Sequence, residues 1–367
     1  MDIRVERVAK VLVNYSTEVK PGDWVVIRGE PIADEMLRAI YREVLAAGGH
    51  PQVLLDPSWL DYTFLRYGND DQLDFVSPSS QLSYEKADVH INIWAETNTK
   101  ALTNVETERI QRRSRATAPL TQLFMNRSAE GSLRWVGTLY PSQAFAQDAE
   151  MSLEEYEEFV YGAGLVNDEN AVERWQAVSA QQQRLVDWLD GRDEVHIRGA
   201  DADLRLSIKG RTFNNTAGKF NFPDGEIYTG PVEDSVNGWV RFTYPAVIGG
   251  REVTGIELTF ENGKVVKASA TKNEEALHGL LETDAGSRYL GELGIGTNPS
   301  INRFTRNMLF DEKIQGTFHL ALGASYPETG GKNEFSIHED IVCDLNDGEI
   351  TVDGETFYRN GDFVIQA

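Results

Sequence analysis

The pattern that most constrains the fold is a pair of short apolar segments separated by an amphipathic one. Residues 24–27 form an apolar run after a Pro-Gly-Asp turn, and residues 52–55 form a second run. Between them, residues 33–47 place apolar side chains at positions i, i+1, i+4, i+5, i+8 and i+9, which is one face of a helix. Asp34 is the expected cap and Gly48 the expected end of this helix. A strand–helix–strand unit of this kind makes the two strands parallel, with a right-handed crossover.

The remainder of the first 192 residues continues this alternation of helices and strands. Further strands are expected at residues 89–94 and 119–125, and helices at residues 100–117, 148–158 and 173–188. Gly191 is the expected stop signal of the last helix. We therefore predict an α/β N-terminal domain with a mainly parallel sheet over residues 1–192.

The strand–helix–strand unit also raises the hypothesis of nucleotide binding. The turn after its first strand reads Arg-Gly-Glu-Pro over residues 28–31. It contains neither the G-x-G-x-x-G fingerprint nor a P-loop. Glu30 would repel a phosphate at this position, so the sequence disfavours dinucleotide binding.

After about residue 192 the chain becomes rich in strands. Asn262-Gly263 lies between two alternating segments, which is the strongest short signal for a β-hairpin. The expected strands are residues 195–197, 204–208, 240–244, 255–260 and 264–270, with a helix at residues 276–289. We therefore predict a second, α+β, strand-rich domain over residues 193–367.

The charge balance excludes several classes of partner. The chain has 58 acidic residues against 35 lysines and arginines, a net charge of −23. Nucleic acids and anionic membranes both need a basic surface, so neither is an expected partner. No apolar run approaches the roughly 18 residues of a membrane span, and the N-terminal segment lacks a signal-peptide core. With a single cysteine and no intrachain disulfide, the expected location is the cytoplasm.

Common nucleophile and metal motifs are missing from the sequence. It contains no G-x-S-x-G, H-E-x-x-H or C-x-x-C. Cys343 follows two apolar residues and is expected in the core rather than as a nucleophile.

Two histidines and several acidic residues have sequence neighbours that suggest a metal site. His338 and Asp340 are two residues apart in an expected strand, so they project from the same face and can share a cation or pair with each other. His319 lies in a short strand-like run, and Glu226 and Glu292 have apolar or glycine-rich neighbours. A carboxylate buried in such surroundings needs a partner, and a metal is one. Mixed carboxylates and imidazoles suit Zn, Co or Mn better than Mg. The alternative interpretation is a set of solvated acids and core histidines.

Five segments, taken in order, resemble the thermophilic metallo-aminopeptidase family of the aminopeptidase T type, peptidase family M29. They read PDGEIYTGP at 223–231, DAGSRYLGE at 284–292, LFDE at 309–312, HLALG at 319–323 and SIHED at 336–340. The N-terminal strand–helix–strand unit and residues 141–156 are also similar to that family. The ordered set is specific, whereas any single segment is not.

The resemblance implies a dinuclear metal site in the C-terminal domain, with two divalent ions per chain (Zn, Co, Mn or Mg). By motif position the ligands are Glu226, Glu292, His319, His338 and Asp340, with Glu292 between the two ions. Glu312 and Tyr326 also match functional positions, and each either binds metal or acts on the substrate. The resemblance further implies a homodimer that removes N-terminal residues from peptides with a free N-terminus.

The implied mechanism suits these residue types. Two cations about 3.5–4 Å apart share a carboxylate and a hydroxide formed from water. Glu312 is the candidate to carry the water's proton to the leaving amine, and Tyr326 to donate a hydrogen bond to the oxyanion. The alternatives are a metallohydrolase of another substrate class on the same site, and a small-ligand-binding protein without catalysis.

Overall fold

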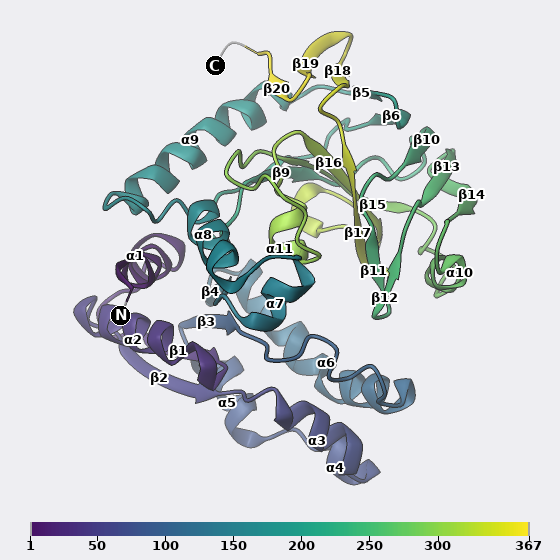
Figure 1. Ribbon diagram of the computed structural model, residues 1–367. Helices are drawn as coiled ribbons and strands as arrows, with labels where there is room; N and C mark the ends of the chain where they lie inside the picture. The colour runs from purple at the N-terminus through teal and green to yellow at the C-terminus, as the bar shows by residue number, and fades with distance from the viewer. Residues whose placement is uncertain (1, 366–367) are drawn as a thin grey trace. The chain divides into compact units, whose positions relative to one another are not determined.

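The computed structural model describes residues 2–365 and divides the chain into two compact units (Figure 1). The residues up to Arg174, together with Gly218–Pro223, form one unit, called here the N-terminal unit. Trp175–Ala217 and the residues from Asp224 onward form the other, called the C-terminal unit. No helix in the described part of the chain has the length and apolar character needed to span a bilayer.

The N-terminal unit is built on a five-stranded sheet of order β2-β1-β3-β4-β8, in which every neighbouring pair is parallel. The strands are β1 (Trp24–Gly29), β2 (His50–Leu55), β3 (Val89–Trp94), β4 (Arg134–Leu139) and β8 (Asn221–Phe222). The helices are α1 (Ile3–Val11), η1 (Leu12–Ser16), η2 (Pro31–Ala33), α2 (Asp34–Ala46), α3 (Trp59–Tyr67), α4 (Asp70–Asp74), α5 (Pro78–Lys86), α6 (Thr107–Ala129), α7 (Gln143–Asp148) and α8 (Leu153–Ala163). The predicted α/β architecture with a parallel sheet is confirmed.

The strand–helix–strand unit forms as the apolar pattern predicts, with one difference at the helix start. Helix α2 joins β1 to β2, and its apolar face is buried at Met36 and Ile40. Asp34 was the expected cap, but it is the first helical residue and the cap position belongs to Ala33. The short helix η2 enters α2 directly, so the Asp34 carboxylate pairs with Arg38 at 2.7 Å instead.

The strand predicted over residues 119–125 does not form. These residues lie in the second half of helix α6, which runs through Pro119. Of the helix predicted over residues 100–117, only the part from Thr107 onward forms. Leu120, Leu123 and Phe124 fit a helical spacing as well as a strand run. Packing decides between the two, because the Phe124 ring lies against the rings of Trp135 and His90.

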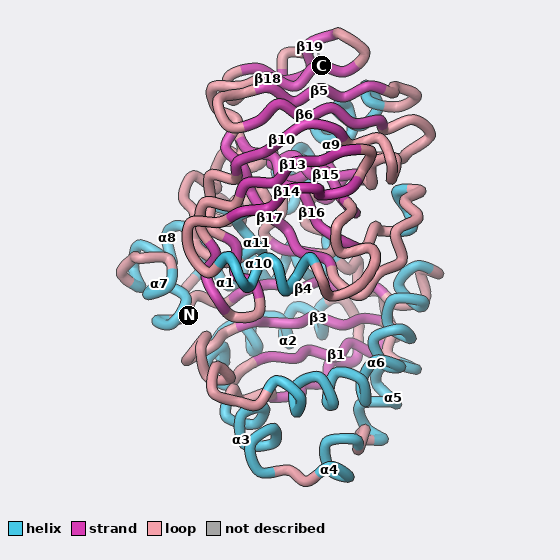
Figure 2. Tube along the Cα trace, turned by 90° about the vertical axis from the view of Figure 1, so that its right-hand side faces the viewer, coloured by secondary structure: helices cyan, strands magenta, loops and turns pink. Residues whose placement is uncertain are grey.

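The C-terminal unit contains two main sheets in which every neighbouring pair is antiparallel. One has eight strands in the order β14-β13-β10-β6-β5-β18-β19-β20, and Figure 2 shows β18, β5, β6, β10 and β13 running side by side. Its strands are β5 (Glu194–Arg198), β6 (Ala202–Ser207), β10 (Asn237–Arg241), β13 (Glu257–Glu261), β14 (Lys264–Ser269), β18 (Glu349–Val352), β19 (Glu355–Arg359) and β20 (Asp362–Phe363). The predicted hairpin forms at Asn262-Gly263, where both residues have positive φ.

The second main sheet has the order β17-β16-β15-β9-β7. Its strands are β7 (Asn214–Thr216), β9 (Glu226–Thr229), β15 (Leu290–Gly296), β16 (Thr317–Gly323) and β17 (His338–Asp344), and a separate hairpin pairs β11 (Ala246–Ile248) with β12 (Arg251–Val253). The helices of the unit are α9 (Ala171–Leu189, which begins in the N-terminal unit), α10 (Glu274–Leu281), α11 (Met308–Asp311) and η3 (Pro327–Thr329). The predicted strand-rich, α+β character is confirmed.

The helix expected over residues 276–289 is only partly correct, since α10 ends at Leu281. Beyond it the Asp284 carboxylate accepts hydrogen bonds from the backbone N–H groups of Gly286 and Ser287 and from Ser336. An aspartate that satisfies neighbouring backbone donors in this way favours a turn over a helix.

The apolar core of the C-terminal unit includes side chains from both main sheets. Leu204 and Phe260 of the eight-stranded sheet belong to the same buried cluster as Leu293 and Leu320 of the five-stranded sheet. Cys343 is part of this cluster, as its sequence context predicts. One face of the five-stranded sheet therefore packs in the core.

Candidate metal centre

The five predicted metal ligands share the other face of the five-stranded sheet. Side chains alternate along a strand, and directly paired residues of an antiparallel sheet lie on the same face. Glu292 of β15 pairs with Ala321 of β16, which pairs with Asp340 of β17. The other ligands join this face through the pairs Glu226 with Gly296, His319 with Gly294 and His338 with Gly323.

Two glycines of β15 leave room for this cluster. A Cβ built on Gly294 would lie 2.0 Å from Nε2 of His319, so the imidazole lies directly over the bare backbone. A Cβ on Gly296 would lie 2.0 Å from the carbonyl oxygen of Ile314. Both positions require glycine because another chain segment occupies the space of a side chain.

Glu292 lies at the centre of the cluster. Its Oε1 is 3.1 Å from Nε2 of His319, and its Oε2 is 3.5 Å from Nε2 of His338. Nε2 of His319 is also 3.3 Å from Oε2 of Glu226, and Nε2 of His338 is 3.6 Å from Oδ2 of Asp340. One carboxylate thus faces two imidazoles, each of which has a second carboxylate beside it.

The orientation of the His338 ring is set by its other nitrogen. Nδ1 lies 2.9 Å from the carbonyl oxygen of Ala324, which can only accept, so Nδ1 is the donor. In the neutral ring Nε2 then carries a free lone pair and points at Glu292 and Asp340. A metal-binding histidine is commonly held by a backbone carbonyl in this manner.

Glu312, the residue that follows α11, brings its carboxylate to the cluster. Its carboxylate accepts a hydrogen bond from the fully buried ammonium group of Lys313, whose Nζ is also 3.5 Å from Oε1 of Glu226. The preceding Asp311 is buried and accepts hydrogen bonds from the backbone N–H and the hydroxyl of Thr305, which hold the segment in place. Sequence reasoning missed Lys313 and Asp311, whose only signal was their place beside Glu312 in the Leu-Phe-Asp-Glu segment.

Tyr326 lies in the loop after β16, and its ring packs on two aromatic neighbours. Its centroid is 5.0 Å from that of His338 and 5.4 Å from that of Tyr228. Burial, followed by the charge of Glu292, raises the pKa of the Tyr326 phenol. The phenol therefore keeps its proton over the working range of pH and can act as a hydrogen-bond donor.

The cluster carries more negative charge than its own cations balance. Burial raises the pKa of Glu226, of Glu312 and of Glu292, the last to about 6. Burial lowers the pKa of His319, but its hydrogen bond to Glu292 and the charge of Glu226 outweigh this effect and raise it to about 10. The carboxylates hold a proton on the imidazole because that positive charge is favourable there.

The donor atoms of this cluster fit a divalent metal. Buried atoms without a hydrogen-bond partner among the described residues include Oε2 of Glu226, Oε2 of Glu292, Nδ1 of His319 and Oδ1 of Asp340. Two overlapping groups have ligand atoms within 4.8 Å of one another: Glu226, Glu292 and His319, and Glu312, His319 and Asp340. Carboxylate oxygens and imidazole nitrogens are the ligands of catalytic zinc and related ions. His338 is outside both groups but adjoins them through Glu292 and Asp340.

All seven residues predicted as site residues thus lie in the C-terminal unit, around one face of its five-stranded sheet. Buried carboxylates and imidazoles that converge in this way define a site of the kind that metal-dependent enzymes use. The model of the thermophilic metalloprotease (M29) family matches residues 1–363, and this chain belongs to that family of enzymes.

Related proteins support the same assignment. Aminopeptidase AmpS of Bacillus subtilis is 31% identical to this chain, over 63% of the chain and 63% of its own length. Aminopeptidase 2 of Geobacillus stearothermophilus is 25% identical over 99% of the chain and 98% of its own length. The resemblance to the aminopeptidase T type is confirmed.

A solved structure shares the fold. That of wild-type AmpT from Thermus thermophilus superposes with a TM-score of 0.85, at 22% identity and 99% coverage of both chains. The similarity extends over both units, so the parallel sheet and the antiparallel region are both parts of this fold.

Proposed function

We propose that this chain is an aminopeptidase that removes N-terminal residues from peptides at a centre of two divalent metal ions. The observation that carries the proposal is the position of Glu292, with one oxygen toward each of two imidazoles. A carboxylate shared in this way suits a ligand that lies between two cations. The names of the related aminopeptidases supply the substrate class.

Two groups of side chains would hold the ions. Glu226, Glu292 and His319 would hold one, and His338 with Asp340 would hold the other, with Glu292 common to both. Divalent ions (Zn, Co, Mn or Mg) bound there supply Lewis-acid activation and lower the pKa of bound water.

Two roles for Glu312 are compatible with this scheme, one supported by its position and the other by its pKa. One of its oxygens lies within 4.8 Å of a ligand atom of His319 and of one of Asp340, a spacing that one shared ion can span, which favours a metal-ligand role. Its raised pKa, caused first by burial, suits a group that takes a proton from water and passes it to the leaving amine. Glu312→Gln separates the two, because a lost ligand lowers the metal content and a lost base does not.

Tyr326 and the surrounding acids act on the substrate. The protonated Tyr326 phenol donates a hydrogen bond to the developing oxyanion of the scissile peptide group. The negative charge of the cluster attracts the protonated amino terminus of a peptide. That attraction favours cleavage at the end of a chain over cleavage at an internal bond.

The test compares two substrates and two metal states. Leucine p-nitroanilide has a free amino group, and its N-acetyl derivative does not. We expect hydrolysis of the first only, loss of the activity after treatment with 1,10-phenanthroline, and its recovery on addition of Zn or Co. Equal cleavage of the acetylated substrate would favour the alternative, a metallohydrolase of another substrate class. No hydrolysis of either substrate by the metal-loaded chain would favour a binding protein.

Two further proposals concern the protein as a whole. The family resemblance supports a homodimer, and the composition supports a cytoplasmic location. Sedimentation-velocity ultracentrifugation tests the first, with a mass twice the 41.1 kDa of one chain as the expected result.

A further inference from the structure

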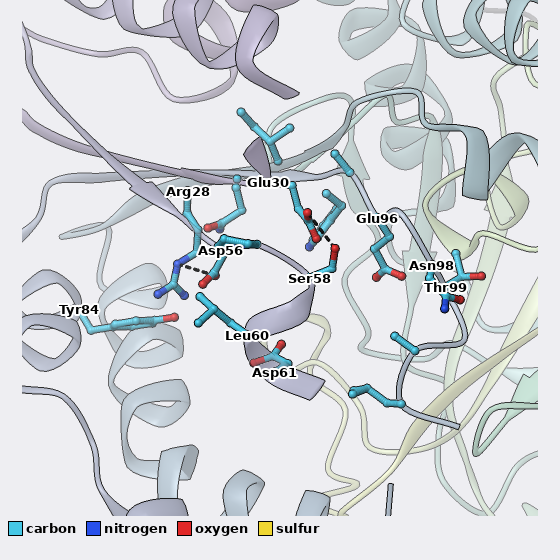
Figure 3. Close-up of a pocket in the computed structure, with 18 residues that line it drawn as sticks. Arg28, Glu30, Asp56, Ser58, Leu60, Asp61, Tyr84, Glu96, Asn98 and Thr99 are labelled. Carbon is cyan, nitrogen blue, oxygen red and sulfur yellow. Dashed lines mark hydrogen bonds and ion pairs between the residues drawn. The ribbon is translucent and has the colours of Figure 1, made fainter. Parts of the chain in front are cut away.

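The N-terminal unit contains a cavity of its own, at the carboxyl ends of its parallel strands (Figure 3). Its volume is about 460 Å³, which is in the range of small-molecule sites. Arg28 and Glu30 line it from the end of β1, Ser58 from the segment after β2, and Trp94 and Glu96 from the end of β3. The residues named for the metal centre all belong to the C-terminal unit, and those that line this cavity all belong to the N-terminal unit.

The sheet topology makes this position a natural ligand site. The chain goes from β1 outward to β2, then returns past β1 to form β3 on its other side. The connections that leave β1 and β3 therefore diverge and open a crevice between them. Ligands of open α/β sheets bind in such a crevice, outside the carboxyl ends of the strands where the strand order reverses.

Glu30 is a buried carboxylate with an incomplete set of hydrogen bonds. Its side chain belongs to a residue that is only 9% exposed. Its Oε2 accepts a hydrogen bond from the Ser58 hydroxyl at 3.0 Å, whereas Oε1 receives none from any described residue. No described base forms an ion pair with this carboxylate, and a cationic ligand that donates to Oε1 would supply that partner.

The lining carries an excess of negative charge. Among the described residues that line it, Arg28 is the only base, and it is paired with Asp56 at 3.2 Å. Burial, and then the charges of Glu30, Asp148 and Asp61, raise the pKa of Glu96. In the view of Figure 3, Ser58 lies between Glu30 and Glu96. The cavity therefore favours a cation and repels phosphate.

An organic cation fits better than a metal ion. Groups of three acids or histidines that converge on one point are found, within residues 2–365, only around His319 in the C-terminal unit. The carboxylates of the cavity are thus too widely spaced for one small ion. Leu60, Tyr84 and Trp94 also line the cavity and offer apolar and aromatic surface to a carbon skeleton.

From this arrangement we propose that the cavity binds a small organic cation, whose ammonium groups donate hydrogen bonds to Glu30 and Glu96. The probe is 1,4-diaminobutane, titrated into the zinc-loaded full chain in a calorimeter. Succinate, a four-carbon compound of opposite charge, and MgCl₂ serve as comparison ligands. The variants are Glu30→Gln and Glu96→Gln, which keep the shape of the side chain and remove its charge. Glu130→Gln, at an exposed site of the same unit outside the cavity, is the matched control.

We expect one molecule of diamine per chain, affinity reduced about tenfold or more by each cavity variant, and no change with Glu130→Gln. Succinate should not bind, and MgCl₂ at matched ionic strength should not displace the diamine. Binding that is unchanged in both cavity variants would place the diamine elsewhere and overturn the proposal. Absence of binding at millimolar concentration, or displacement by Mg²⁺ alone, would also overturn it. Glu96 is half-buried, so its variant provides the test if Glu30→Gln does not fold.

Discussion

The bare backbone of Gly294 under the His319 imidazole makes a single methyl group a sharp probe of the metal centre. In Gly294→Ala the new Cβ would lie 2.0 Å from Nε2 of His319. Non-bonded atoms of this kind approach to about 3.5 Å, so the ring must retreat by about 1.5 Å. Metal–ligand distances tolerate only about 0.2 Å. His319 is fully buried, so a retreat of its ring must displace neighbouring groups of the cluster.

The expected loss of metal affinity follows from the role of the His319 ring as a metal ligand. Loss of a residue that merely orients a metal ligand weakens binding by about 10–100-fold. Displacement of the ligand itself should therefore weaken binding by about 100-fold or more. The same crowding should lower the free energy of unfolding by about 1–3 kcal/mol, which leaves the chain folded.

The assay is a competition between the full chain and a chromogenic chelator for Zn²⁺, with urea unfolding measured in parallel. The matched control is Gly279→Ala in α10, where an added Cβ meets no atom within 4 Å. It should leave metal affinity unchanged and stabilise the chain by about 0.5–1 kcal/mol, as alanine does in a helix. If Gly294→Ala binds zinc as tightly as the unsubstituted chain, His319 is not a ligand and the reasoning from the close approach fails.

Three further predictions test other parts of the account. Glu292→Gln should abolish hydrolysis of leucine p-nitroanilide and lower the metal content of dialysed protein measured by mass spectrometry; full metal content would refute the shared role. Tyr326→Phe should lower kcat about 100-fold with unchanged metal content, and an unchanged kcat would remove Tyr326 from the mechanism. Burial lowers the pKa of His90 from the usual 6.5 to about 4, so the unfolded chain binds more protons between these values. Stability should therefore fall by as much as about 3 kcal/mol as pH drops through that window. His90→Gln should flatten this dependence in urea unfolding, and an unchanged slope would contradict it.

Much of the fold follows from local pattern, because the determining contacts are close in sequence. The first strand–helix–strand unit needs only apolar spacing and a pair of glycines, and the hairpin at Asn262-Gly263 needs only two residues with positive φ. Residues 119–125 show the limit of such patterns. Their apolar residues suit a helix or a strand, and packing against Trp135 and His90 decides.

The site shows the same division between local and distant information. His338 and Asp340 share a face because they are two residues apart, which the sequence alone predicts. The crowding of His319 over Gly294 depends on the register between β15 and β16, which no local pattern specifies. Lys313 reads as an ordinary surface cation beside Glu312, yet it is fully buried between two carboxylates. Its position depends on the packing of residues 313–314 against the backbone of Gly296 in β15, and the sequence around Lys313 does not predict that contact.

The most direct test of the central claim is the rate of leucine p-nitroanilide hydrolysis as Zn²⁺ is added to the metal-stripped full chain. The account predicts no activity in the stripped chain, and a rise that reaches its plateau by two equivalents of metal per chain. Full activity without metal would contradict it, because the buried cluster around Glu292 would then have no part in the reaction.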